Sequence, residues 1–300
     1  MGFTSIDDYV QETTTNGKTF SQNFTRTIDT GATSVAGRWH SCFTTGGTGG
    51  AMTVTGTAGT GIVMDSSKVG AIPINSAVTP DTRHLSRLLS LTPTATAVPA
   101  TLILTDIIHI YPSCVLTGTP STLSNHPTWT GTGDTRMTNA NGVQCSLLVT
   151  TAGTAGNGEV LPTYVDQDGN SQAAPRSLKA VATTHPTGCF YSDASAAVTL
   201  GSPFMAMAAG DRGVRQVTSY TIPTGLTTGV GAFILHRPIA EIPLTALNTA
   251  SLLNFLNEDP ALPRIYDDSC LAFMINVGGA LVTGGSISDL SNTFGDSNVI

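Results

Sequence analysis

Short apolar runs, separated by turn-forming residues, recur along the whole chain and most constrain its fold. Runs such as "AMTVTG", "GIVM", "GVQCSLLVTTAG" and "CLAFMINVGG" stand between clusters of Gly, Pro, Asn and Ser. In "VQCSLLVT", Val143, Cys145, Leu147 and Val149 alternate with polar residues, which is the period of a strand with one buried face. Such a series of short strands is typical of a β-sandwich or barrel and not of alternating βαβ units.

The composition favours the same fold class. Only three Lys and four Glu occur among the 300 residues, and these two residue types normally coat the exposed faces of helices. Charged residues make up 11% of the chain, compared with about 25% in typical soluble domains. Because 40% of residues are hydrophobic, the chain can still build a core. We therefore predict an all-β protein, a jelly-roll-like β-sandwich with one or two short helices and extended terminal arms.

Two segments break the strand pattern and are predicted to be helices. Residues 81–90, within "TPDTRHLSRLLSL", follow an N-cap candidate and place Leu85, Leu88 and Leu89 on one helical stripe. Residues 244–257 are flanked by prolines and also carry leucines at helical spacing. Both helices would be short insertions in the β fold.

The two ends of the chain contain few bulky apolar residues. We expect residues 1–30 to form an N-terminal arm and residues 286–300 a C-terminal tail, on either side of a β-sandwich domain at residues 31–285. Both ends would find their partners outside that domain. The N-terminus has no basic segment followed by an apolar one, and no window approaches 18 apolar residues. We therefore expect neither a signal peptide nor a membrane span.

The cysteines are odd in number and widely spaced, a pattern that does not indicate disulfide pairs. We expect free thiols in a protein made in the cytosol, each buried as a small hydrophobe. The five residues are Cys42, Cys114, Cys145, Cys189 and Cys270.

The glycine-rich stretch "GGTGGAMTVTGTAGTG" is the first candidate for a ligand-binding loop. A dinucleotide fingerprint needs Gly at positions i, i+2 and i+5. The candidates that begin at Gly47 and Gly59 have Met52 and Met64 at the last position. The one Gly-Lys-Thr triplet of the chain lacks the leading Gly of a phosphate loop. An alternating strand pattern follows the glycines, so we interpret them as turns or a flexible loop and not as a phosphate cradle.

Motifs for metals and nucleophiles are equally weak. The segment "VDQDGNSQ" begins like a calcium loop, but Gly169 comes two places early and Ser177 stands where a bidentate Glu belongs. We interpret it as a hairpin turn. The six histidines show no metal-ligand spacing, and Gly-x-Ser-x-Gly is absent. We therefore expect no catalytic residue, no metal and no cofactor.

Two groups of polar residues remain, and both have structural interpretations. Asp106 and His109 in "DIIHIY" lie across the pleat of a strand from one another, and we interpret them as polar residues at the edge of the core. Asp267 and Asp268 are adjacent in sequence and are interpreted as a turn pair.

The segment "RWH" is the most conspicuous aromatic and cationic group. An Arg stacked on Trp can anchor a neighbouring subunit or a sugar, although a Trp at a strand edge more commonly packs over its own core. The candidate interface comprises this group and the aromatic residues of the N-terminal arm: Arg38, Trp39, His40, Phe3, Tyr9, Phe20 and Phe24.

The charge distribution bears on possible partners. The net charge is −7 and the pI is near 5.2. The Arg residues are scattered singly, with no basic stripe, so we expect no nucleic-acid contact. A surface so poor in charge has weak self-repulsion and suits a protein packed against copies of itself or against a larger assembly.

Four phrases give the chain a resemblance to known proteins. "AGRWHSCFTTGGTGGA", "MAAGDRGVRQVTSYTI", "GAFILHRPIAEIPL" and "IYDDSCLAFMINVGGAL" are spread from residue 36 to residue 281. They resemble segments of tailed-bacteriophage virion proteins encoded near the major capsid protein. The resemblance implies a β-rich decoration or cement protein, frequently trimeric, that binds over the capsid lattice. It carries over no catalytic or ligand-binding residue.

Our leading hypothesis is therefore a non-enzymatic virion protein that sits on the capsid surface after synthesis in the bacterial cytoplasm. Its expected partners are the major capsid protein and further copies of itself, as a homotrimer, with no nucleic acid and no membrane. The alternatives are a tail or fibre component that binds host glycans, a major capsid protein, or a β-rich polysaccharide hydrolase. The last of these would need a pair of carboxylates in a cleft.

Overall fold

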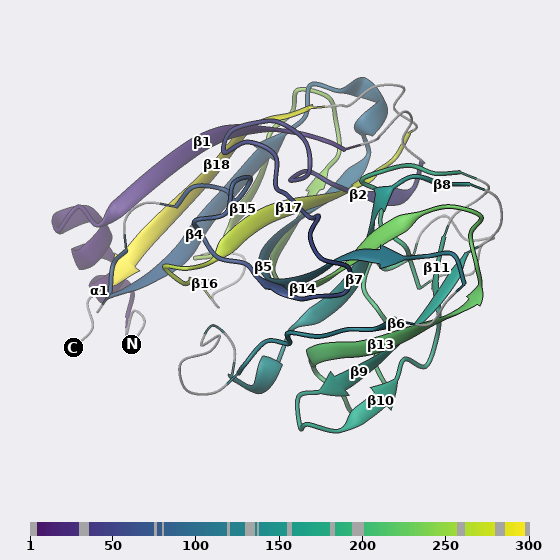
Figure 1. Cartoon of the computed structure of the whole chain (residues 1–300). Coiled ribbons are helices and arrows are strands. Elements are labelled where there is room, and N and C mark those ends of the chain that lie inside the picture. Colours follow the sequence, from purple (N-terminus) through teal and green to yellow (C-terminus); the bar gives the residue numbers. More distant parts are fainter. Residues whose placement is uncertain are drawn as a thin grey trace.

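A computed structural model describes residues 5–29, 36–74, 77–79, 81–118, 121–129, 136, 138–154, 158–180, 184–193, 201–256, 262–279 and 286–297, the last range by its backbone. Strands make up 48% of these residues and helices 6%. All pairs of labelled strands are antiparallel, and they form several sheets packed in layers (Figure 1). The all-β sandwich predicted from the sequence is confirmed.

The terminal sheet contains strands from both ends of the chain. Its order is β1 (Thr19–Thr27), β18 (Ser286–Ser297), β4 (Thr82–Leu91) and β15 (Ser251–Asn254), and β16 (Arg264–Ile265) also pairs with β4. Neighbouring strands are therefore distant in sequence, and Figure 1 shows helix α1 (Ile6–Val10) near the end of β18 at one end of this sheet.

Two further sheets complete the layers. The central sheet has the order β2 (Arg38–Ser41), β17 (Cys270–Val277), β5 (Ala100–Val115), β14 (Val230–Leu244) and β7 (Gln144–Thr151), and β3 (Ile62–Val63) also pairs with β5. The distal sheet has the order β10 (Ser171–Ala173), β9 (Glu159–Asp166), β13 (Val214–Thr224) and β6 (Ser121–Thr122), and β11 (Leu178–Lys179) also pairs with β9. A small ladder joins β8 (Gly153–Thr154) to β12 (Thr184–His185).

One face of the central sheet carries two cores in succession. Leu102 and Leu104 of β5 belong to the core shared with the terminal sheet, and Ile108 belongs to the core shared with the distal sheet. Because alternate residues of a strand share a face, these three side chains lie on one side of β5. The opposite face packs against loops that contribute Met52 and Met64. Asp106 lies between the two cores, on the face that they share.

The helix predicted at residues 81–90 is wrong, because the segment is strand β4. The register between β4 and β18 shifts at this point, so that Leu85 pairs with Phe294 and Arg87 pairs with Thr293. The extra residue between them, Ser86, forms a β-bulge, which shifts the alternation of side chains by one residue. Leu85 and Leu88 therefore both reach the core, at the spacing of three that resembles a helix.

The helix predicted at residues 244–257 is also wrong. The described part of this segment holds the edge strand β15, preceded by exposed turn residues. Leu253 packs against the core beneath the terminal sheet, while Leu252 is 48% exposed. The leucines thus alternate between two faces of a sheet, where helical spacing had placed them on one stripe.

The expected terminal arms are strands of the domain itself. β1 pairs with β18 over most of its length, and β18 pairs with β4 on its other side. Alternating polar and apolar residues suit a half-exposed sheet, which explains why these segments have few bulky apolar residues. The division into residues 1–30, 31–285 and 286–300 is corrected accordingly. Before β1, Ser5 caps helix α1 (Ile6–Val10), which continues into a π-helical turn at Gln11–Thr15.

Candidate functional site

Asp106 is the most deeply placed charged residue at the boundary between the two cores, and its side chain is fully buried. Oδ1 accepts hydrogen bonds from Arg136 Nη1 at 3.0 Å and from the backbone N–H of Cys270 at 2.9 Å. Oδ2 accepts from the Ser269 hydroxyl at 2.9 Å. A buried carboxylate is tolerated only with such compensation. Asp106 therefore ties the middle of β5 to the start of β17.

Arg136 completes this buried ion pair and is itself 1% exposed. Its guanidinium donates to the carbonyl of Met64 at 2.7 Å and to that of Asp268 at 3.2 Å. Nη2 of Arg237, the cross-strand neighbour of Asp106, lies 3.7 Å from Oδ2. Arg136 thus joins three segments that are far apart in sequence. Its planar guanidinium can do so because it carries several N–H donors in a fixed arrangement.

The pKa of Asp106 reflects its surroundings. Burial raises the pKa of the carboxyl, whereas Arg136, Arg237, Ser269 and the Cys270 amide oppose that rise. The net result is a pKa above the ordinary value of an aspartate, although cations and hydrogen-bond donors contact both oxygens. Both carboxylate oxygens of Asp106 are directed at partners inside the protein, so the residue has a structural role in holding these segments together.

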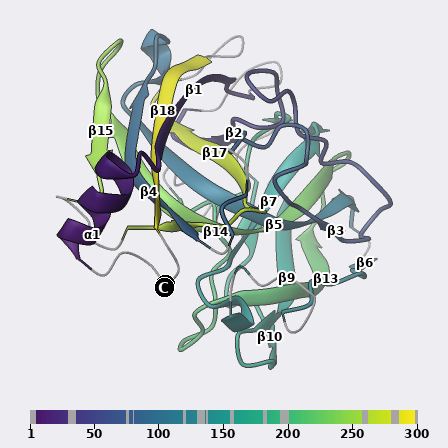
Figure 2. The same cartoon turned by 90° about the vertical axis from the view of Figure 1, so that its left-hand side faces the viewer.

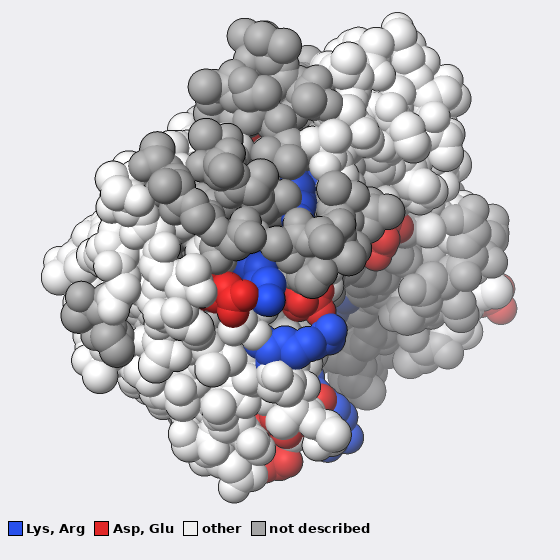
Figure 3. Space-filling view, turned by 90° about the vertical axis from the view of Figure 1, so that its right-hand side faces the viewer, with Lys and Arg blue, Asp and Glu red and all other residues white. Residues whose placement is uncertain are grey.

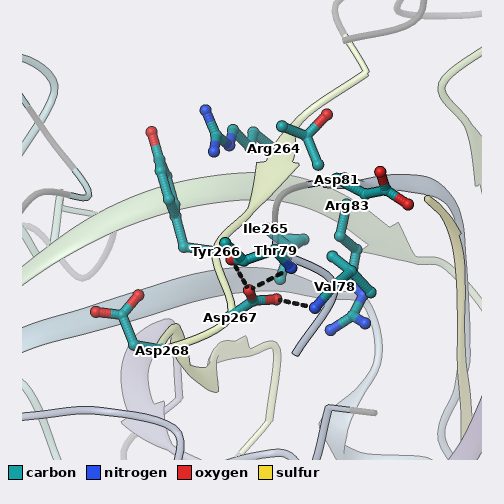
Figure 4. A pocket seen from close by; sticks show the side chains of 10 residues that line it. Val78, Thr79, Asp81, Arg83, Arg264, Ile265, Tyr266, Asp267 and Asp268 are labelled. Atoms are coloured by element: carbon teal, nitrogen blue, oxygen red, sulfur yellow. Dashed lines mark hydrogen bonds between the residues drawn. The ribbon is translucent and has the colours of Figure 1, made fainter. Parts of the chain in front are cut away.

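The turn that follows β16 presents a second carboxylate to an open groove of about 590 Å³. Figure 4 shows Asp267 pointing at the segment of Val78 and Thr79. Its oxygens accept from the backbone N–H of Val78 at 3.0 Å and from the Thr79 hydroxyl at 2.6 Å. Burial raises the pKa of Asp267, but these hydrogen bonds outweigh it and bring the pKa below its ordinary value. Asp267 and Asp268 form the turn predicted from the sequence.

Tyr266 and Arg264 form another wall of this groove. The guanidinium carbon of Arg264 lies 4.5 Å from the centre of the Tyr266 ring, and that of Arg237 lies 5.2 Å from it. Stacking of this kind holds a guanidinium in place without a carboxylate partner. The groove therefore offers an ordered, exposed Arg264 to anything that binds there.

The visible surface is otherwise sparsely charged. On the face shown in Figure 3, acidic and basic side chains lie beside one another amid a largely uncharged surface. Such an arrangement produces no extended field of one sign, and recognition there would rely on shape and uncharged contacts.

The structure places Arg38, Trp39 and His40 inside the chain, in β2. The Trp39 indole N–H donates to the carbonyl of Gly201 at 3.1 Å, and Nδ1 of His40 lies 3.0 Å from the carbonyl oxygen of Asp29. The expectation that this group faces a partner is corrected, because its side chains are 9% exposed or less. Packing of the Trp over its own core, the commoner alternative, is what the fold shows.

The aromatic residues of the N-terminal segment are divided between core and surface. Phe24 is buried, with its ring centre 5.8 Å from that of Phe273, so it too is removed from the candidate interface. Phe20 is half-buried beneath the guanidinium of Arg83, and Tyr9 is half-buried on α1. The remaining candidate, Phe3, lies outside the described residues.

The glycine-rich stretch forms a packed loop held by Arg26. This fully buried guanidinium donates to the carbonyl of Gly50 at 2.8 Å and to that of Gly70. Gly70 N–H in turn donates to the Gly49 carbonyl at 2.7 Å. Gly49 and Gly59 lie in turns, whereas the alternating run at residues 51–56, expected to be a strand, has no regular secondary structure. The loop is anchored to β1 through Arg26.

The calcium-like segment is a turn between β9 and β10, as interpreted from the sequence. Asp166 Oδ1 accepts from the backbone N–H of Asp168 and of Asn170, each at 2.8 Å. Within the described ranges, no group of three or more His, Cys, Asp or Glu side chains is placed to hold a metal ion. No helix in those ranges is long and apolar enough to cross a membrane.

Sequence reasoning missed the cluster around Asp106. A signal was present, because a charged residue inside "TLILTDIIHI", which is apolar on both faces, needs a buried cation. Local spacing could not identify Arg136 as that cation, since the two residues are thirty positions apart. The pairing of Tyr266 with Arg237 likewise depends on which strands become neighbours.

Comparisons with known proteins place the chain in no family. No family model and no curated protein matches it. A solved structure of the infectious bursal disease virus VP2 subviral particle is 8% identical, with 97% of this chain and 87% of that chain covered and a TM-score of 0.20. A structure of the Gx strain of the same virus is 10% identical, with 93% and 80% covered and a TM-score of 0.19. Scores this low do not indicate a shared fold.

Proposed function

We propose that this chain is a non-enzymatic structural protein of a tailed-bacteriophage virion, which decorates the capsid and stabilises it. The observation that carries the proposal is that buried charged residues form contacts within the fold, whereas few charges lie on the visible surface. Asp106, Arg136 and Arg26 hold segments of the fold together, while the visible surface is sparsely charged. Such a molecule suits close packing among many identical neighbours. The resemblance of four phrases to phage virion proteins supports the same conclusion.

A decoration protein acts through linkage. It binds the assembled shell and not the separated subunits, so each bound copy shifts the equilibrium towards the intact shell. We propose the major capsid protein as its partner, and a homotrimer as its own assembly. Three identical contacts then add their binding free energies through effective concentration, at the threefold positions of an icosahedral lattice.

The proposal is tested by adding the full chain to purified shells that lack it. We expect the chain to sediment with the shells to saturation and to raise the temperature at which they break open. If the chain stays in the supernatant at every concentration, the proposal is wrong. Binding to host-cell glycans without binding to shells would instead favour a tail or fibre component.

A further inference from the structure

Strand β15 forms an outer edge of the terminal sheet, as Figure 2 shows. It pairs with β4 on one side, and no described residue pairs with its other side. Three of the large hydrophobic side chains that this molecule exposes lie on β15 or next to it. Leu247, Leu252 and Leu256 are 41%, 48% and 38% exposed.

The backbone of Leu252 is directed towards the open side of this edge. Phe255 N–H donates to the carbonyl of Ser86 at 3.0 Å, which continues the ladder between β15 and β4. Backbone groups of successive residues point to opposite sides of a strand, so Phe255 and Leu253 face β4. The N–H and C=O of Leu252, which lies between them, therefore point away from β4.

β15 is short, but this edge lacks two other features that normally keep sheet edges apart, charge and Pro. Proteins protect exposed edges with charged residues, especially Lys, and with Pro. Residues 242–257 contain no charged side chain, and β15 contains no Pro. An uncharged edge with an exposed Leu and outward backbone groups is one that another strand would pair with.

We propose that β15 pairs antiparallel with β15 of a second copy, across a two-fold axis that places Leu252 opposite Leu252. Each Leu252 N–H then donates to the C=O of the other, which is the reciprocal bonding of an antiparallel pair. The lack of charge argues for an identical partner: the same edge meets it without repulsion, and a charged partner would find no ion pair here. The inference rests on the proposed function, which brings many copies onto one lattice, and it supplies a contact that joins neighbouring copies there.

A cysteine at this position tests the pairing directly. The five native cysteines are all buried, so Leu252→Cys adds an exposed thiol to a chain without one. Directly opposite Cα atoms in a hydrogen-bonded pair are about 5.5 Å apart, within the range of a disulfide. We expect mild oxidation to convert L252C into a covalent dimer at low micromolar concentration. The control is V69C, because Val69 is 66% exposed in a turn outside the strands.

Equal cross-linking of L252C and V69C, or no cross-linking of either variant, would overturn the pairing.

A second variant tests the pairing without oxidation. Leu252→Lys places two ammonium groups opposite one another, and we expect association between copies, measured by sedimentation, to weaken at least about tenfold. V69K should associate as the unmodified chain does. Unchanged association of L252K contradicts the proposal.

Measuring how the same variants bind shells distinguishes failure of the β15 pairing from failure of the proposed decoration function. If the unmodified chain pairs through Leu252 but never binds shells, the decoration function fails and the pairing stands. If the chain binds shells while L252C does not cross-link on them or in solution, the pairing fails and the decoration function stands.

Discussion

Asp106 and Arg136 show how one buried pair of residues can determine stability. Replacing Asp106 by Asn keeps the size of the side chain but removes the buried counter-charge of the Arg136 guanidinium, which is 1% exposed. We expect D106N to lower the free energy of unfolding by about 3–5 kcal/mol, the cost of breaking a buried pair from one side. Urea denaturation followed by fluorescence measures this loss.

The matched control for D106N is D268N. The Asp268 carboxylate is 56% exposed and lies 3.9 Å from Arg136 Nε, so its removal should cost no more than about 1 kcal/mol. Equal losses in the two variants would show that the buried pair has no special role.

His236 makes the fold sensitive to mild acid. It is fully buried, Nδ1 lies 3.0 Å from the Thr105 hydroxyl, and Nε2 has no hydrogen-bond partner in the described structure. Burial lowers the pKa of His236 to about 3, whereas an unfolded His has a pKa of about 6.5. Between these values the unfolded chain binds a proton that the folded chain does not. Stability is therefore lost as the pH falls through this window.

We expect the free energy of unfolding to drop by about 2–3 kcal/mol between pH 6.5 and pH 4.5, at about 1.4 kcal/mol per pH unit. Urea denaturation at a series of pH values measures the slope. The H236Q variant should show a much smaller dependence of the unfolding free energy on pH. The H126Q variant, changed at a half-buried position, should keep most of that dependence. A slope that survives in H236Q would exclude His236 as its origin.

At the scale of the element, the loop held by Arg26 depends on the absence of a side chain at Gly70. Its φ is +91°, and a Cβ there would lie 2.3 Å from the backbone nitrogen of Met52. Gly210 has a similar φ of +97° with nothing within 4 Å of a Cβ. Both Gly→Ala changes incur the cost of a left-handed conformation, about 1–2 kcal/mol. Only G70A also forces the backbone of the loop to move.

We therefore expect G70A to lower the free energy of unfolding by at least about 2 kcal/mol more than G210A does. Thermal unfolding of the two variants in parallel isolates the packing contribution, because the conformational cost is common to both. Equal melting temperatures would mean that the loop yields freely and that Arg26 does not hold it.

Strand β4 shows what the sequence could and could not predict at this scale. The fold class followed from alternating runs such as "VQCSLLVT", whose period is local. The identity of β4 did not, because a bulge at Ser86 gives Leu85 and Leu88 the spacing of a helix. The bulge exists only in the register with β18, about two hundred residues away, and no local pattern reports it. Arg136 was missed as a partner of Asp106 for the same reason.

At the scale of the whole molecule, the layered sheets shield every thiol. All five cysteines are free and buried, as predicted from their spacing. Burial raises the pKa of Cys114 and of Cys189 to about 12 and raises the other three as well. Since the thiolate is the reactive form, we expect almost no reaction with a thiol reagent at pH 8 in the folded protein and five equivalents in denaturant. Three or fewer in denaturant would contradict free thiols.

The position of β18 has a consequence for the order in which the protein is made. It lies between β1 and β4, both of which leave the ribosome long before it. Until residues 286–297 emerge, the terminal sheet lacks the strand that joins its first and later parts, and the core beneath it is only partly covered. Strand β18 thus completes the layer, so a chain cut short before residue 286 is left with β1 and β4 lacking their common neighbour. Only a chain translated through this strand can therefore join β1 to the rest of the terminal sheet.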